Sequence, residues 1–228
     1  MGIEHLGLDK EAESKWRTKD EFIVASLTDR KTEEIQYGKP FPDIFPADKA
    51  RHLQFLGEDV AISGINEHPK YSTGYYSCIG CVVIGKTKAG KNISLMTHQL
   101  GMEQGKTKQE FKQDLEHFLS QVEPGTVDAV LFGGEFDMSY KKWREDPAPL
   151  YIRQIESSAS IMRDVLGFDP TVLAGPASGS YRYVDAAVDT ETRRMWIIRP
   201  AQQPEVAPWS FPARQVREVL RNATNQKT

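Results

Sequence analysis

The sequence has only two cysteines in 228 residues, too few for a framework of disulfides. It also lacks long apolar runs, because the longest, such as 81–84 and 129–132, fall far short of the ~18 residues that a membrane span needs. Basic residues are not in excess either, since 29 Lys and Arg stand against 32 Asp and Glu. We therefore expect neither a membrane span nor a nucleic-acid partner.

The N-terminal stretch, MGIEHLGLDKEAESK, lacks the basic start and the apolar segment of a Sec signal peptide. From this we expect a cytoplasmic protein, or an effector that is secreted by a route independent of a signal peptide.

The composition supports a folded core. Hydrophobic residues make up 39% of the chain, and Phe, Tyr and Trp number 10, 8 and 4, which argues against a disordered chain. The polar residues 1–50 are interpreted as an N-terminal arm that packs partly on the domain formed by 51–228. Within the arm, the spacing of apolar residues predicts one helix over 19–27.

Strand and helix patterns alternate along the rest of the chain. A capping box at Thr107–Glu110 predicts the start of a helix that stops before Pro124, and a second helix is predicted over 149–166. A last helix is predicted over 212–222, and strands over 59–65, 81–85, 92–97, 127–132, 170–174, 181–188 and 194–198. This order predicts a layered α/β or α+β domain with helices packed on a mixed sheet.

Both cysteines lie in the motif Cys78-Ile79-Gly80-Cys81, which has several interpretations. A thioredoxin-type redox pair normally precedes a helix, whereas here Val82-Val83-Ile84 favours a strand. A zinc site would need His68 and His98 as further ligands, and no second close pair of ligands is present. Two buried, inert cysteines are a third interpretation.

The fourth interpretation makes Cys81 a nucleophile. Such a cysteine needs a base and N–H donors for a developing oxyanion. His98 follows at the end of the second arm of the hairpin predicted from 81–85 and 92–97, with a turn over 86–91. Antiparallel pairing would bring the two residues together, so the sequence predicts a Cys81–His98 dyad. Gly80 would allow close approach of backbone or substrate.

The segments 76–84 and 95–98 resemble the catalytic hairpin of CheD, the chemoreceptor glutamine deamidases. The Gly80-Cys81 pair also resembles deamidase toxins of the cytotoxic necrotizing factor type. The resemblance continues in order through AVLFGG at 129–134, the helix at 149–166 and GSYRYVD at 179–185, and covers roughly 58–200. It implies a CheD-like fold.

The resemblance also implies roles for individual residues. Cys81 would be the nucleophile and His98 the base. The family has a Thr about six positions before its Cys, where this chain has Tyr75, with Thr73 nearby, so the third member stays open. Independently of the resemblance, the position of Gln99 beside His98 would let it orient the imidazole or the substrate.

The implied activity is hydrolysis of a Gln side-chain amide on a protein target through a thioester, as in a toxin or effector. No metal and no cofactor would be required. Transglutamination, a papain-like thiol protease or acyltransferase, and a catalytically silent binding domain remain alternatives. A deamidase would need a small pit at the end of the hairpin, with 72–76, 99–102 and the loop after 134 as its rim. The sequence does not indicate an oligomeric state.

Overall fold

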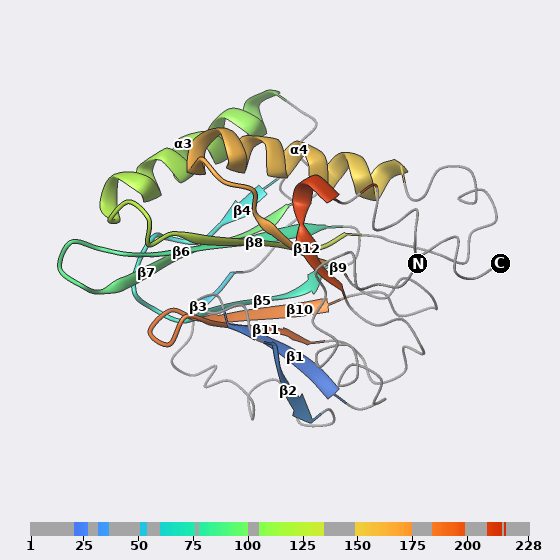
Figure 1. Cartoon of the computed structure of the whole chain (residues 1–228), viewed down its shortest axis with the longest axis horizontal. Coiled ribbons are helices and arrows are strands. Elements are labelled where there is room, and N and C mark those ends of the chain that lie inside the picture. The colour runs from blue at the N-terminus through green and yellow to red at the C-terminus, as the bar shows by residue number, and fades with distance from the viewer. Residues whose placement is uncertain are drawn as a thin grey trace.

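The computed structural model describes residues 21–26, 32–36, 51–53, 60–75, 78–99, 105–134, 149–174, 184–198, 209–215 and 217. These residues form an α+β fold in three layers: two helices, then one sheet, then a second sheet (Figure 1). The helices cover only one face of the first sheet, and the second sheet covers its other face. The predicted layered fold with mixed strand directions is therefore confirmed, but with two sheets in place of one.

The sheet beside the helices, sheet B, has the order β12-β9-β8-β6-β7-β4. Adjacent strands of this sheet are antiparallel, except that β8 and β9 are parallel to each other. Its strands are β4 (Val60–Ile62), β6 (Ile79–Lys86), β7 (Asn92–Gln99), β8 (Asp128–Gly133), β9 (Thr171–Ala174) and β12 (Trp209–Pro212).

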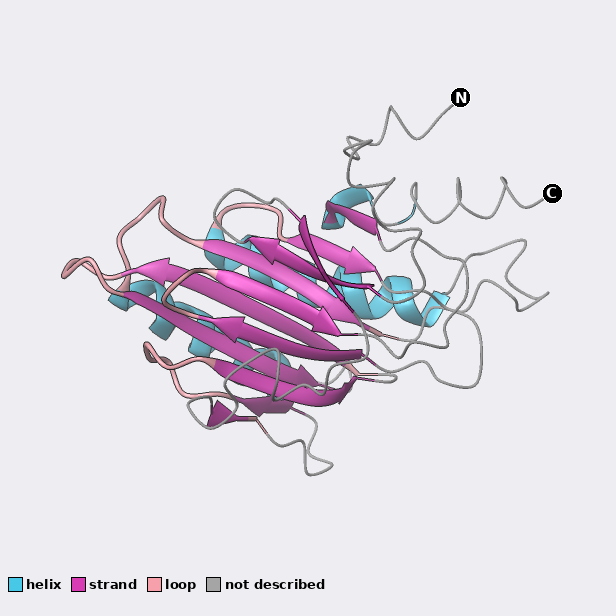
Figure 2. Ribbon diagram, turned by 90° about the horizontal axis from the view of Figure 1, so that it is seen from below, coloured by secondary structure: helices cyan, strands magenta, loops and turns pink. Residues whose placement is uncertain are grey.

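The outer sheet, sheet A, has the order β2-β1-β11-β10-β5-β3, and only its edge pair β3 and β5 is parallel. Figure 2 shows its strands and those of sheet B in front of the two helices. The strands are β1 (Glu21–Ser26), β2 (Thr32–Gln36), β3 (Arg51–His52), β5 (Lys70–Tyr75), β10 (Val184–Asp189) and β11 (Arg194–Ile198).

Two buried apolar layers hold these elements together. Helices α3 (Gly105–Gln121) and α4 (Pro149–Leu166) present apolar side chains at helical spacing to one face of sheet B. This first layer contains Ile79, Cys81, Val83, Leu95, Phe111, Leu115, Phe118, Leu131, Ile155 and Met162. The second layer lies between the sheets and contains Tyr75, Cys78, Val82, Ile84, Met96, Val130, Phe132, Ala186, Val188 and Met195. Consecutive residues of β6 therefore alternate between the two layers, as a strand buried on both faces requires.

Several predicted elements are confirmed. The two helices, the β6–β7 and β10–β11 hairpins, and strands β4, β8 and β9 all lie within a few residues of their predicted positions. The helix predicted over 19–27 is wrong, because Glu21–Ser26 is β1 and pairs with both β2 and β11. Pairing across the sheet overrides the local pattern here. Strand β5 was not predicted at all.

Two of the predicted regions extend beyond the described residues. Strands β1 and β2 belong to the predicted arm and extend sheet A, while the remainder of 1–50 lies outside the described residues. Of the helix predicted over 212–222, the structure describes a short 3-10 turn, η3 (Ala213–Gln215), which follows β12.

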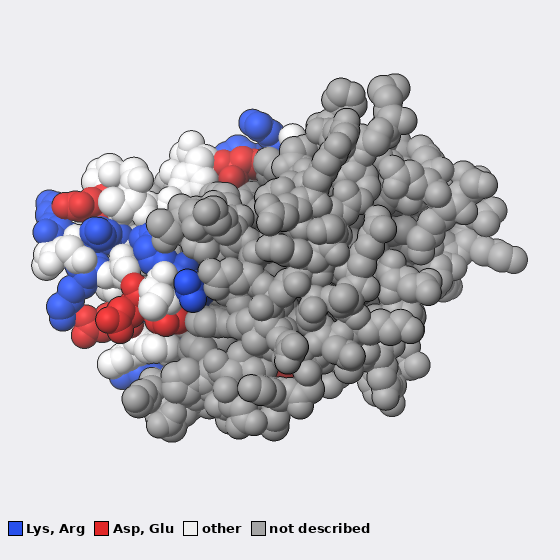
Figure 3. Space-filling view, turned by 60° about the horizontal axis from the view of Figure 1, so that its bottom comes forward, with Lys and Arg blue, Asp and Glu red and all other residues white. Residues whose placement is uncertain are grey.

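The described surface at the hairpin turns carries charges of both signs (Figure 3). Lys91 and Glu67 form an ion pair of 2.9 Å there, and both side chains are more than half exposed. None of the described helices combines the length and the apolar character needed to cross a membrane.

Candidate functional site

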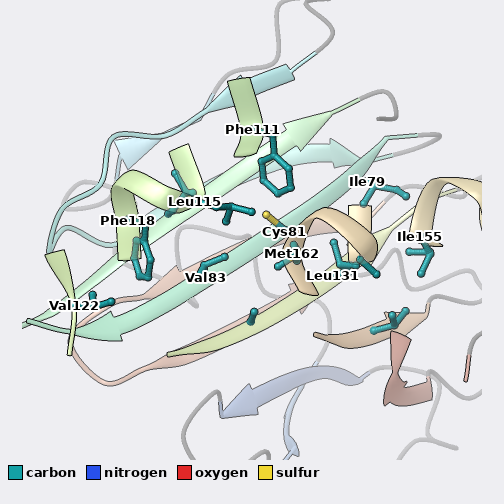
Figure 4. Close-up of a cluster of buried hydrophobic side chains, with 14 of the residues drawn as sticks. Ile79, Cys81, Val83, Phe111, Leu115, Phe118, Val122, Leu131, Ile155 and Met162 are labelled. Carbon is teal, nitrogen blue, oxygen red and sulfur yellow. The ribbon is translucent and has the colours of Figure 1, made fainter. Parts of the chain in front are cut away.

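Cys81 lies in the middle of sheet B and points toward the helices. It is fully buried and belongs to the layer between sheet B and the helices. Figure 4 shows it on β6 in the same buried cluster as Leu115 and Met162. The predicted nucleophile is therefore placed in an apolar layer that α3 and α4 cover.

His98 belongs to the other layer. Its ring stacks on Tyr75 with a centroid distance of 3.9 Å and an interplanar angle of 15°. Its Nδ1 lies 3.0 Å from Ser72 Oγ, and both of these contacts come from β5 of sheet A. Cys81 and His98 consequently point to opposite faces of sheet B, and the predicted dyad is not present in this arrangement.

The length of the hairpin turn explains this correction. A six-residue turn over 86–91, as the sequence suggested, would have put Cys81 and His98 on one face. In the structure Lys86 pairs with Asn92, so the turn has one residue fewer. A register change of a single residue moves a whole strand's side chains to the opposite face.

The β6–β7 ladder has an irregularity beside Cys81. Pairing runs from Lys86–Asn92 to Val82–Met96 and resumes at Ile79–Gln99, which makes Cys81 and Thr97 opposite neighbours. The Cys81 N–H donates to the side-chain Oγ1 of Thr97 at 3.0 Å. The Thr97 carbonyl instead accepts the Tyr75 hydroxyl at 2.9 Å. Two side-chain hydrogen bonds thus replace one rung of the ladder at the thiol.

Thr97 also contacts the sulfur, because its hydroxyl donates to Cys81 Sγ at 3.3 Å. Burial raises the pKa of Cys81 to about 12, and this hydrogen bond opposes the increase. Burial lowers the pKa of His98 to about 4. At neutral pH both groups are therefore uncharged in this arrangement.

The contacts of Ser72 determine the tautomer of His98. The single hydroxyl proton of Ser72 is donated to the Leu53 carbonyl at 2.6 Å. The His98 Nδ1 must then carry the proton that is donated to Ser72 Oγ. In the neutral ring, Nε2 is consequently the basic nitrogen.

A polar strip lies on the helix side of sheet B, next to Cys81. Thr97 and Gln99 project from β7, and Gln99 Nε2 donates to Ser158 Oγ of α4 at 3.2 Å. All three side chains are fully buried, and Gln154, one helical turn before Ser158, is also buried. This strip interrupts a layer that is otherwise apolar.

The remaining predicted site residues have different surroundings. Tyr75 is fully buried between the sheets and does not form an exposed rim, and Thr73 is exposed on β5. Thr73 is therefore not part of the site. Gly80 faces Tyr75 and Phe132 so closely that a Cβ there would overlap Phe132 and lie 2.7 Å from Tyr75 Cε1. Gly80 thus permits packing between the sheets.

A bulge brings Ser72 and Tyr75 to the same face of β5. The pairing with β10 shifts between Val184–Tyr75 and Ala186–Ser72, so β5 has one extra residue there. Gly74 adopts a φ of 77°, which favours glycine, and its N–H donates to Asp185 Oδ1. Ser72 and Tyr75 can both reach His98 for this reason.

Cys78 lies in the layer between the sheets, opposite the face of Cys81, as predicted. No disulfide joins the chain's two cysteines. Among the described residues, no group of three His, Cys, Asp or Glu side chains is arranged to hold a metal ion.

Sequence analysis missed Thr97 and Ser158 as site residues, and it placed Ser72 in the rim of the pit and not beside the His98 ring. For Thr97 a local signal was available, because a residue with a hydroxyl directly before the predicted base His98 is itself a candidate for the site. The contacts of Ser72 and Ser158 depend on a strand and a helix that are distant in the sequence. Parts of the predicted rim at 76, 100–102 and after 134 lie outside the described residues.

Comparison of the sequence with known proteins finds no matching family model and no matching curated protein.

Proposed function

We propose that this chain is a cysteine-dependent amidohydrolase of the CheD-like type, which converts a Gln side chain of a protein to Glu. The observation that carries the proposal is the irregular rung at Cys81. There the N–H next to the thiol bonds a side-chain hydroxyl and not the Thr97 carbonyl. The Cys81 N–H is held by a side-chain hydroxyl, which can rotate away, and not by a backbone carbonyl, so a developing oxyanion could replace that hydroxyl as its acceptor.

The proposed reaction uses Cys81 and water. The Cys81 thiolate attacks the side-chain carbonyl carbon, and the Cys81 N–H stabilises the tetrahedral oxyanion. The C–N bond breaks, the nitrogen takes a proton and leaves as ammonia, and a thioester remains. Water then hydrolyses the thioester and restores the thiol. Thr97 supports the thiolate, because a hydroxyl that donates to sulfur favours the charged form.

His98 is the proposed base, through Nε2, but its ring lies on the face of sheet B away from Cys81, so the proposed step needs an arrangement other than this one. Burial raises the pKa of Cys81 and lowers that of His98, so it favours the neutral pair over the thiolate–imidazolium pair. Thr97 and Tyr75 are the contacts that connect the two faces, since Tyr75 bonds Thr97 and stacks on His98. Proton transfer from Cys81 to His98 therefore needs a rearrangement here that brings the two side chains to one face of sheet B.

A second candidate is a binding domain without catalytic activity. The complete burial of Cys81 and its raised pKa favour this candidate, because a protonated and enclosed thiol is a poor nucleophile. A thiol protease is less well supported, since the polar strip beside the thiol is short and buried.

Intact-mass proteomics separates these candidates. Candidate target proteins are incubated with the full chain and with Cys81→Ala, and Cys78→Ala is the matched control. The proposal predicts a gain of about one dalton at a Gln with the full chain and with Cys78→Ala, but not with Cys81→Ala. Addition of a primary amine in place of the one-dalton gain would identify a transglutaminase. Identical spectra for all three proteins, with ammonia absent, would support the binding domain.

A further inference from the structure

We propose that Gln99 and Ser158 form a subsite that binds a primary carboxamide next to Cys81. This inference rests on the proposed function and names the group that the site selects. It concerns the helix side of sheet B, where the thiol lies, and not the side of His98.

The position of Gln99 relative to Cys81 is the first support. Gln99 pairs with Ile79 across the β6–β7 ladder, and Cys81 is opposite Thr97. Gln99 is consequently the diagonal neighbour of Cys81 on the same face, where Cβ atoms are within roughly 7–8 Å. The two side chains therefore project into the same part of the layer, and a group that bonds Gln99 would lie beside the thiol.

The hydrogen bonding of Gln99 is the second support. Its side chain is fully buried, and its Nε2 donates to Ser158 Oγ. Its Oε1 is buried and has no hydrogen-bond partner among the described residues. A buried acceptor without a donor disfavours folding, and such an acceptor needs an explanation beyond packing. The N–H of a bound ligand supplies the missing donor.

Ser158 is held in place by a helix face that packs on the sheet. Ile155, Ala159 and Met162 of α4 belong to the apolar layer, and Ser158 lies among them, fully buried. A rigid helix therefore positions the hydroxyl, and the hydroxyl positions the Gln99 amide.

A primary carboxamide suits this subsite better than its hydrolysis product. The amide has both N–H donors and a carbonyl acceptor, so it complements Gln99 in either orientation of the Gln99 amide group. A carboxylate has acceptors only and would face Gln99 Oε1. The polar side chains of the strip (Thr97, Gln99, Gln154 and Ser158) are all neutral. The carboxylate of the product would thus be buried without a counter-ion, and the cost of burying this charge promotes release of the product.

Binding measurements with small probes test the inference. The probes are N-acetylglutamine methylamide, the corresponding glutamate and its γ-methyl ester. Each is titrated by NMR into the full chain carrying Cys81→Ala, so that no turnover occurs. We expect the carboxamide to bind about tenfold more tightly than the other two, the effect of one or two hydrogen bonds.

Substitutions then assign the preference to these residues. Gln99→Met keeps the shape but removes both polar groups, and it should bring the three affinities within about twofold of one another. Ser158→Ala removes only a hydroxyl and is therefore less prone to misfold than Gln99→Met. It should weaken carboxamide binding several-fold. Gln109→Met, on the exposed face of α3, is the control and should keep the preference. Absence of carboxamide binding, or a preference that survives Gln99→Met in a folded protein, would overturn the inference.

The outcomes separate this inference from the proposed function. Carboxamide binding that depends on Gln99, without ammonia release by the unmodified chain, would support the subsite and refute the deamidase. Ammonia release with an unchanged kcat/KM in Gln99→Met would support the deamidase and refute the subsite.

Discussion

Cys81 and His98 occupy neighbouring strands of one hairpin, yet their side chains lie on opposite faces of sheet B. The thiol faces the helices, and the imidazole faces sheet A. Thr97 and Tyr75 link the two sides through the irregular rung of the ladder. The proposed chemistry therefore depends on whether a rearrangement at that rung can bring the thiol and the imidazole to one face.

The ionisation of Cys81 in the folded protein should increase steadily with pH. Burial raises its pKa to about 12, so its thiolate fraction grows about tenfold per pH unit from pH 7 to 10. An ordinary thiol, with a pKa near 8.5, levels off within this range. We expect the thiolate of Cys81, followed by its ultraviolet absorbance and not by labelling because the thiol is fully buried, to show no plateau up to pH 10.

The control is the same measurement on the unfolded chain, where Cys81 should level off near pH 9. If the folded protein instead shows a plateau below pH 8, the thiolate is already paired with an imidazolium. Such a result would contradict the neutral resting pair and favour the dyad predicted from the sequence.

The hairpin was predictable from sequence, but its register was not. Apolar, β-branched runs on both sides of a polar turn define the two arms. The sequence of the turn, 86–91, does not indicate whether Lys86 belongs to the strand. Because Lys86 pairs with Asn92, the register differs by one residue from the predicted one, and this difference moves His98 to the other face. The extents of helices α3 and α4 were predicted to within a few residues because their apolar spacing is a local signal, but α3 begins at Gly105, so Thr107 of the predicted capping box lies inside the helix.

Strand β5 illustrates what sequence patterns do not reveal. Its residues KYSTGY include no apolar alternation, and Gly74 suggests a turn. The strand exists because it pairs with β10 and β3, which are distant in the sequence. For that reason the sequence did not predict that Ser72 and Tyr75 contact His98.

His98 should be neutral at pH 7 with its proton on Nδ1. The Ser72 hydroxyl donates to the Leu53 carbonyl, so Ser72 can only accept from the imidazole. Nitrogen NMR chemical shifts report the tautomer, and their titration should give a pKa of about 4, lowered by burial. In Ser72→Ala the preference for the Nδ1–H form should weaken. A proton on Nε2, or a pKa above 6, would be inconsistent with these contacts.

The same titration links His98 to stability. Its pKa is lower in the folded protein than the ordinary value of 6.5, so the unfolded chain binds more protons between pH 6.5 and 4. Its contribution to the free energy of unfolding is thus complete above pH 6.5 and is lost as pH falls toward 4. The unfolding free energy is measured by denaturant at several pH values between 4 and 6.5. The full chain should lose this contribution as pH falls, whereas His98→Gln should not.

Lys70 should make the protein more stable as pH rises from 7 to 9. Its ammonium is buried and donates to the carbonyls of Asn66 and His68 and to Ser94 Oγ. Burial, and Arg51 nearby, lower its pKa from 10.5 to about 7. The unfolded chain therefore binds more protons above pH 7, and the free energy of unfolding increases with pH by up to about 1.4 kcal/mol per unit.

Lys70→Met tests this contribution, and Lys86→Met, at an exposed position, is the control. The difference in unfolding free energy between the full chain and Lys70→Met should change across pH 7–9, whereas the control should show no such change. The window ends near pH 9 because Cys81, with a raised pKa, acts in the opposite direction above it. A difference that is constant with pH would mean that Lys70 keeps an ordinary pKa.

Gly80→Ala should destabilise the fold at the centre of the site. A methyl group there would overlap the Phe132 ring and lie 2.7 Å from Tyr75 Cε1, and both rings are fully buried. Overpacking of this kind costs about 1–3 kcal/mol. Gly64→Ala is the matched control, because the only close atom is the end of the flexible Asn66 side chain. Denaturant unfolding should show a lower midpoint for Gly80→Ala with an unchanged slope, and a near-normal midpoint for Gly64→Ala.

The Gly80→Ala variant has a second readout at His98. Since Tyr75 stacks on His98, displacement of the Tyr75 ring should also shift the His98 NMR signals. Equal stability of the two variants would mean that the rings yield freely and that Gly80 is not required for this packing.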